Sequence, residues 1–197
     1  QISKHLSEDA LSKLPEHFSL RVINTANDTA LLAGCFVIVL TPLLVNLKSL
    51  HVSDLQDEMN GNFFRELLPK AKKLEKLVIE NVEFGESSHI ENDLIPAING
   101  SINLHESLRE LHITCSTVKF SEEFITAIEH FTKLQKLNLS TLYVSDGRFM
   151  SELPFVIEQM QCLESLNINS SESYLGSISL KNIFKALNSK TIKELQI

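Results

Sequence analysis

The chain has no tryptophan and only three cysteines in its 197 residues. These cysteines, Cys35, Cys115 and Cys162, are widely spaced and form no CxxC pair, whereas a small secreted domain would show paired, clustered cysteines. Four Asn-X-Ser/Thr sequons favour the secretory route instead, but the cysteine usage carries more weight. We therefore predict a cytoplasmic protein that needs no disulfides to fold, because a chain of this length buries enough apolar surface.

Basic residues are also scarce. The chain has 18 Lys and Arg against 25 Asp and Glu, which gives a net charge of −7. Proteins that bind nucleic acids carry a basic face that offsets the phosphates. Domains held on anionic lipids by charge need a basic cluster as well. The acidic balance therefore argues against nucleic acid and against a charged membrane surface as partners.

Catalytic motifs are absent. The sequence has no GxxxxGK[ST] phosphate loop, no GxGxxG, no HExxH and no GxSxG. Adjacent carboxylates such as Glu122 and Glu123 fit the first turn of a helix, where negative charge is favourable. Cys115 and Cys162 flank strands and are predicted to be small core residues rather than nucleophiles. We predict no catalytic residue, no metal site, no cofactor and no small-molecule substrate, and hence a protein that is not an enzyme.

What the sequence does contain is a repeat. An aliphatic residue, two variable residues, a second aliphatic, one variable residue and a third aliphatic recur, as in Leu47-Lys-Ser-Leu50-His-Val52. The second aliphatic position returns about every 29 residues, the length of the longer leucine-rich repeats. This central position is held by Leu20, Leu50, Leu77, Leu111, Leu137, Leu166 and Leu195, the first in a weak copy that begins at His17.

Each repeat predicts one strand and one helix. Apolar and variable residues alternate through Leu50, His51 and Val52, which is the period of a strand. Between the strands, apolar residues recur with the spacing of an amphipathic helix. The predicted buried helix positions are Phe63, Phe64, Leu67 and Leu68; Phe124, Ile125, Ile128 and Phe131; Phe149, Leu153, Val156, Ile157 and Met160; and Ile183, Phe184 and Leu187.

No single unit buries both its strand face and its helix face, so neighbouring units must stack to close the core. We predict an α/β fold of the leucine-rich repeat solenoid (horseshoe) type, with parallel strands on the concave face and helices on the convex face. Residues 1–197 are expected to form one domain of about seven irregular repeats, as a fragment of a longer protein. The longest repeat, between Leu77 and Leu111, predicts polar surface loops at 85–93 and 99–101.

The variable positions of the strands point to the concave face and are the candidate protein-binding positions. From Ser49 onward this face holds no Trp, Tyr, Phe or Arg, the residues that usually anchor tight interfaces, so a merely solvated face is the alternative. His51 and His112 lie two repeats apart, on the order of 10 Å, which is too far to share a metal ion. The candidates are His51, Lys76, Glu80, Glu110, His112, Lys136, Asn138 and Asn167.

One run breaks the amphipathic pattern. Residues 30–45 carry no charge, yet these sixteen residues fall short of the roughly 20 that a membrane span needs. We predict no membrane span, and a helix that is apolar on every side is normally covered on every side. The cover is either another domain or chain, which we predict, or residues 1–17 folded back. The predicted contact residues are Phe36, Val37, Val39 and Leu40.

The segments Leu47-Lys-Ser-Leu-His-Val-Ser-Asp-Leu-Gln56 and Leu74-Glu-Lys-Leu-Val-Ile-Glu-Asn-Val-Glu-Phe84 resemble the leucine-rich repeats of NLR proteins, the cytosolic innate-immune receptors that build inflammasomes. The likeness is closest to the CARD-bearing members. The resemblance implies a C-terminal sensor and autoinhibitory domain, with nucleotide-binding and signalling domains before Gln1. It implies other proteins, or other domains of the same chain, as partners. It assigns no nucleotide ligand to any residue of this sequence.

Two other classes of protein fit the same repeat. One is the substrate-recognition part of an F-box-type ubiquitin-ligase adaptor, and the other is a free-standing leucine-rich repeat scaffold. Sequence on the N-terminal side of Gln1 would separate the three classes. An F-box helix cluster there would indicate the ligase adaptor, a Walker-type nucleotide-binding domain the NLR receptor, and the absence of both a free-standing scaffold.

Overall fold

The computed structural model of the chain describes residues 16–21, 43–53, 63–82, 89–115, 122–141, 147–170, 177–188 and 190–197. They form a seven-stranded parallel sheet in which the strands follow one another in chain order. The strands alternate with helices, so the fold class is α/β, as predicted. The strands are β1 (His17–Arg21), β2 (Ser49–Ser53), β3 (Lys76–Val82), β4 (Glu110–Cys115), β5 (Lys136–Thr141), β6 (Ser165–Ser170) and β7 (Glu194–Gln196).

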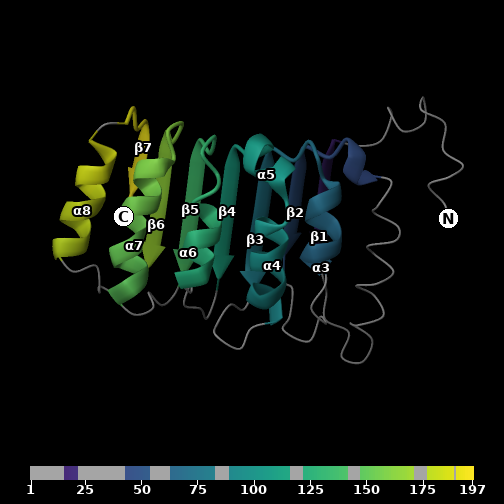
Figure 1. Cartoon of the computed structure of the whole chain (residues 1–197), viewed down its shortest axis with the longest axis horizontal. Helices are drawn as coiled ribbons and strands as arrows, with labels where there is room; N and C mark the ends of the chain where they lie inside the picture. The colour runs from purple at the N-terminus through teal and green to yellow at the C-terminus, as the bar shows by residue number, and fades with distance from the viewer. Residues whose placement is uncertain are drawn as a thin grey trace, which may run out of the picture.

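The α-helices cover one face of the sheet and stand side by side along it (Figure 1). Because each connection leads from one strand to its immediate neighbour, the helices keep the order of the strands. The α-helices are α3 (Phe63–Leu67), α4 (His89–Asn99), α5 (Ile102–Ser107), α6 (Glu122–Ile128), α7 (Gly147–Gln159) and α8 (Ser177–Leu187). Two short 3₁₀ helices accompany them, η2 (Leu43–Val45) and η3 (Leu68–Lys70).

The core lies between the sheet and the helices, and a row of leucines runs through it. Leu50 pairs in register with Leu77, and the same position continues from strand to strand as far as Leu195. From Leu50 to Leu166 these side chains are buried. Each buried leucine is worth about 1.5–3 kcal/mol relative to an exposed one. The strands and the register predicted from Leu50 onward are thus confirmed.

The register predicted for the first strand is wrong by two residues. Phe18, and not Leu20, pairs with Leu50. The backbone fixes this register, because the carbonyl of Glu16 accepts the N–H of Ser49 at 3.0 Å, in the arrangement that recurs before every later strand. The weak copy of the repeat has a histidine where the first aliphatic residue should stand, so the pattern alone could not separate the two registers.

The helix positions predicted to be buried are confirmed in α3, in α6 with Phe131 after it, and in the described side chains of α7 with Met160 after it. In α8 the prediction fails for one residue, since Ile183 and Leu187 are buried but Phe184 is 54% exposed. Ala186 takes an inward position instead, because it shares a helix face with Ile183 and Leu187. A large apolar side chain such as that of Phe184 is therefore not buried by virtue of its size alone.

The described part of the first predicted surface loop, residues 89–93, is helical, and the second, residues 99–101, is a short turn between two helices, while residues 85–88 lie outside the described residues. Residues 89–93 belong to α4, and the junction at Gly100 and Ser101 leads into the additional helix α5. Ser101 is buried, and its hydroxyl donates a hydrogen bond to the carbonyl of Ala97 at 2.5 Å. Leu104 of α5 is also buried. The insertion thus extends the core.

A buried carboxylate joins two neighbouring units. Asp93 of α4 is 3% exposed, and its two oxygens accept the backbone N–H of Phe64 at 2.6 Å and of Arg65 at 3.1 Å. The first N–H groups of a helix have no acceptor within that helix, so Asp93 caps α3 from the next unit. Burial raises the pKa of Asp93 despite these hydrogen bonds.

The predicted contact residues Phe36, Val37, Val39 and Leu40 lie outside the described residues, as does most of the alternative cover, residues 1–17, of which only Glu16 and His17 are described. Of the uncharged run, only the part from Leu43 onward is described, and there Leu44 is buried. Among the described helices, none is long and apolar enough to cross a membrane.

We expect Leu137→Ala to lower the free energy of unfolding by about 2–5 kcal/mol, because it opens a cavity beneath the sheet. The matched control is the neighbouring Asn138→Ala, which removes a side chain on the other face and should cost less than about 0.5 kcal/mol. Urea denaturation of both variants measures the difference. Equal losses would show that the register of β5 is wrong.

We expect Asp93→Ala to cost about 2–3 kcal/mol, since it leaves the buried N–H of Phe64 and the part-buried N–H of Arg65 without an acceptor. Asp93→Asn keeps one acceptor oxygen in place and should cost about half as much. Urea denaturation again provides the measurement, and an alanine variant as stable as the asparagine variant would contradict the capping role.

Candidate binding face

The face of the sheet that points away from the helices, here called the open face, presents side chains in three parallel rows. In a row, neighbouring side chains stand about 4.8 Å apart, the distance between strands. All eight predicted binding residues lie in these rows. The first row is Ser49, Lys76, Glu110, Lys136, Ser165 and Glu194; the middle row is His51, Val78, His112, Asn138, Asn167 and Gln196; the third is Ser53, Glu80, Thr114, Ser140 and Asn169.

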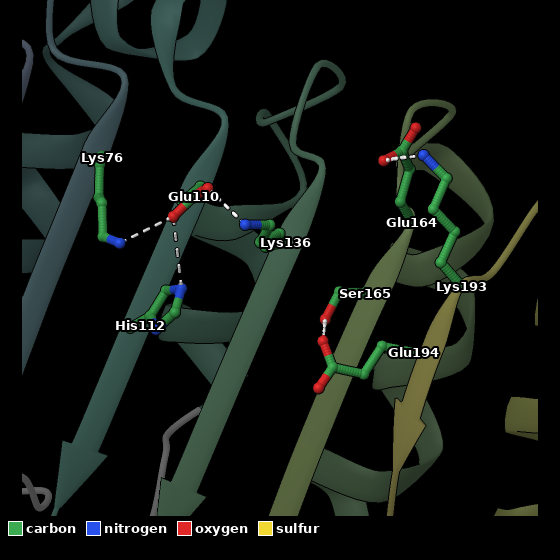
Figure 2. Close-up of polar contacts among 8 residues, drawn as sticks. All are labelled: Lys76, Glu110, His112, Lys136, Glu164, Ser165, Lys193 and Glu194. Atoms are coloured by element: carbon green, nitrogen blue, oxygen red, sulfur yellow. Dashed lines mark hydrogen bonds and ion pairs between the residues drawn. The ribbon is translucent and has the colours of Figure 1, made fainter.

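A three-residue charge cluster occupies the centre of the first row (Figure 2). Glu110 on β4 stands between two lysines, with its carboxylate oxygens 2.9 Å from Lys76 Nζ on β3 and 2.8 Å from Lys136 Nζ on β5. The parallel register sets these three residues directly opposite one another. The cluster therefore joins three consecutive units through side chains, in addition to the backbone of the sheet.

The two lysines keep the carboxylate of Glu110 ionised. Partial burial favours the neutral form of Glu110, but the hydrogen bonds from Lys136 and Lys76 outweigh it and hold the pKa of Glu110 below its ordinary value. The hydrogen bond that Lys136 donates to Glu110 in turn raises the pKa of Lys136. At neutral pH the cluster thus carries two positive charges and one negative charge.

His112 lies below the cluster in the middle row. Its Nε2 is 3.9 Å from the Glu110 carboxylate, which is too long for a hydrogen bond. Burial lowers the pKa of His112, and the nearby Lys76 cation lowers it further. The imidazole is therefore neutral at physiological pH.

Three consecutive positions of the middle row hold polar atoms without partners. His112 Nε2, Asn138 Oδ1 and Asn167 Oδ1 are buried and make no hydrogen bond to any described residue. They belong to β4, β5 and β6, and each is in register with the next. The three side chains that carry these atoms are half-buried, so this row combines unused hydrogen-bonding capacity with side chains that a partner can touch.

His51 and Glu80 form a separate pair, with His51 Nε2 3.0 Å from Glu80 Oε2. The pair connects β2 with β3. Val78, a variable position expected to be exposed, is buried at 8% exposure. It stands between His51 and His112 in the middle row, and these two rings flank it on both sides. The row is therefore polar at its centre and apolar at Val78.

Contacts between β6 and β7 continue the pattern, although the sequence reasoning did not single them out. Ser165 donates a hydrogen bond to Glu194 at 3.1 Å. Just before these strands, Lys193 Nζ lies 2.8 Å from Glu164 Oε2, and both contacts are visible in Figure 2. A signal was present, because residues of opposite charge or matching polarity occupy the same repeat position in consecutive units.

The described residues include no group of three or more His, Cys, Asp or Glu side chains that could hold a metal ion. His51 and His112 stand on strands separated by β3, and each lies near a different carboxylate. Cys162, predicted as a core residue, is exposed, because it sits in the turn that precedes Leu163.

No family model matches this chain, and a search of curated proteins finds no match to it. Functional inference therefore rests on the sequence and on the geometry of the open face.

We expect Glu110→Gln to remove the pH-dependent part of the stability of the cluster. Because the folded state lowers the pKa of Glu110, its stabilising effect is fully present above the ordinary glutamate pKa of about 4.3. It is lost as the pH falls through the folded-state pKa. The variant should be less stable than the parent by about 1 kcal/mol at pH 7, and the difference should shrink toward zero in acid.

Thermal unfolding from pH 7 to pH 2.5 checks this expectation. Glu75→Gln serves as the control, since Glu75 is exposed just before β3 and lies outside any helix, so its loss should change the melting temperature equally little at every pH. A difference for Glu110→Gln that stays constant over the whole range would contradict the ionic role of this residue.

Proposed function

We propose that the chain is a non-enzymatic protein-interaction module built as a leucine-rich repeat solenoid, with the open face as its concave surface and the helices on the convex side. Two features support this proposal. The leucines of the repeat pattern hold the same register position in neighbouring strands, and the helices fill the other side of the sheet (Figure 1).

The observation that carries the proposal is the middle row of the open face, with its unpaired atoms on His112, Asn138 and Asn167. A buried polar atom without a partner costs about 1–3 kcal/mol. The side chains are half-buried, so rotation toward a bound protein would let these atoms form hydrogen bonds that recover that free energy. The row extends along three strands, so it suits an extended partner segment rather than a small molecule.

The charge cluster adds selectivity to this surface. Lys76, Glu110 and Lys136 neutralise one another in part, so the row offers a small excess of positive charge beside the unpaired amides. A partner segment with one or two acidic side chains would be favoured over a basic one, because complementary charge mainly excludes wrong partners.

We propose further that this module is the sensor and autoinhibitory domain of a cytosolic NLR-type innate-immune receptor. The support is the resemblance of residues 47–56 and 74–84 to NLR repeats, together with three dispersed cysteines in 197 residues, which is typical of a reducing compartment. In such a receptor the open face binds another domain of the same chain or a protein partner, and the repeats hold the receptor inactive.

The coding sequence on the N-terminal side of Gln1 tests the NLR assignment. A Walker-type nucleotide-binding domain is expected there, whereas an F-box helix cluster, or neither, would overturn it and leave only the interaction module. The purified chain should hydrolyse no ATP. ATP hydrolysis that a single substitution within the chain abolishes would overturn the non-enzymatic proposal.

The role of the open face is tested by titrating this chain with the separately produced nucleotide-binding domain that we expect on the N-terminal side of Gln1. We expect Asn138→Lys with Asn167→Lys to weaken binding to the nucleotide-binding domain at least tenfold, because two large cations then fill the middle row. Glu123→Lys, which places a cation on the outer side of α6, is the matched control. Equal affinity of both variants in isothermal titration calorimetry would exclude the open face as the binding surface.

A further inference from the structure

Two histidines from neighbouring units lie ring against ring beside the inserted helix α5. The ring centres of His105 on α5 and His130, which follows α6, are 5.0 Å apart, and the ring planes are inclined by 30°. In the chain, β4 lies between the two residues, so they belong to different units. This contact, here called the histidine pair, therefore joins the inserted helix to the unit that follows it.

A hydrogen bond fixes where His105 can take up a second proton. Its Nε2 lies 2.9 Å from the carbonyl oxygen of Ile98. Because a carbonyl only accepts, the neutral ring carries its proton on Nε2 and donates it, which leaves Nδ1 to bind another. The buried ring of Phe131 also packs against His105 in a T-shaped contact, with ring centres 5.7 Å apart. This apolar neighbour offers no charge that would compensate an imidazolium.

The surroundings disfavour a positive charge on His105. The side chain is half-buried, and burial lowers the pKa of His105, as does the closeness of His130. The hydrogen bond to Ile98 and the carboxylate of Glu106 act in the opposite direction, but the net result is a lowered pKa. Glu106 contributes little because it forms an ion pair with Lys133.

The other described charges around α5 are engaged elsewhere. The helix packs against α4 and η3, where Asp93 caps α3 and Lys70 pairs with a glutamate of α3. The guanidinium of Arg109 donates to backbone carbonyls. Glu129, next to His130, is exposed, so the solvent weakens its effect. A protonated histidine pair therefore has no carboxylate of its own.

We propose that the histidine pair is a pH-sensitive switch, which holds α5 against the following unit at neutral pH and releases it in mild acid. Two neutral rings pack against each other without electrostatic cost. Two protonated rings place like charges 5.0 Å apart. This distance is shorter than the Debye length of about 8 Å at physiological ionic strength, so dissolved salt does not screen the repulsion. Separation of the rings relieves it and restores the hydration of His105.

The direction of the pH effect follows from the lowered pKa of His105. In the released form the ring is hydrated and takes up its proton near the ordinary histidine pKa of about 6.5. In the packed form it does so only at lower pH, so protons favour the released form. The hold of the pair is therefore complete above about pH 6.5, and it is lost as the pH falls through the pKa of the packed form.

A second link limits this release to a local movement. Glu106 and Lys133 connect the same two units, and the hydrogen bond from Lys133 lowers the pKa of Glu106. This ion pair thus persists at a pH where both histidines are charged. Acid is expected to loosen α5 while the sheet stays folded. The inference is independent of the proposed function.

Hydrogen exchange of the whole chain, read by mass spectrometry, tests the switch. The protection factor is the quantity to compare, because it removes the intrinsic effect of pH on exchange. Between about pH 7.5 and pH 5, a range that spans the ordinary histidine pKa, the protection of residues 104–108 should fall at least tenfold. The helix α8, which contains no histidine, is the internal reference and should keep its protection.

Two variants separate the pair from burial of His105 alone. His130 is exposed, so His130→Gln should fold normally, remove the repulsion and leave α5 protected in acid. His51→Gln changes a histidine that pairs with Glu80 on the open face, and this control should keep the pH dependence of the parent chain. The proposal is overturned by a protection of α5 that does not change with pH, by an equal fall in α8, or by an equally steep fall in His130→Gln.

Discussion

One backbone contact, repeated at the start of each strand, sets the geometry of this protein. The carbonyl of the residue just before a strand accepts two N–H groups from the next unit. Lys48, for example, accepts those of Glu75 at 2.8 Å and Lys76 at 2.9 Å, and the same pair of bonds returns at every later strand. Because side chains alternate with a period of two, a slip of one residue would move every leucine to the open face. The backbone ladder and the buried leucines therefore enforce the same register.

This double constraint explains which parts of the fold the sequence predicts well. From Leu50 onward, leucine spacing and backbone pairing agree, and the predicted strands and register are confirmed. At β1 the first aliphatic residue is missing, so only the backbone decides, and the pattern places Leu20 where Phe18 belongs. Phe184 illustrates a second limit. Burial on a helix depends on which residue faces the sheet, and a small residue such as Ala186 can take that place while a large one points outward.

The candidate site divides in a similar way. The residues that line the open face can be predicted from the alternation of side chains along each strand, and all eight predicted residues lie there. The contacts between these residues cannot be predicted in this way, because they depend on side chains from different units. The sequence alone does not show that Glu110 would bridge two lysines or that Val78 would be covered between two histidines. The contacts between β6 and β7 could have been predicted by comparing the same repeat position in consecutive units, since a parallel register brings those residues together.

The charged groups and the uncharged polar groups of the open face contribute differently to what this surface can bind. On the open face, Glu110 holds both lysines at hydrogen-bond distance, so little long-range field remains and recognition depends on short-range hydrogen bonds along the middle row. Such a surface discriminates between partners at short range, because a partner that leaves one of these polar atoms unpaired recovers none of the free energy that its burial costs.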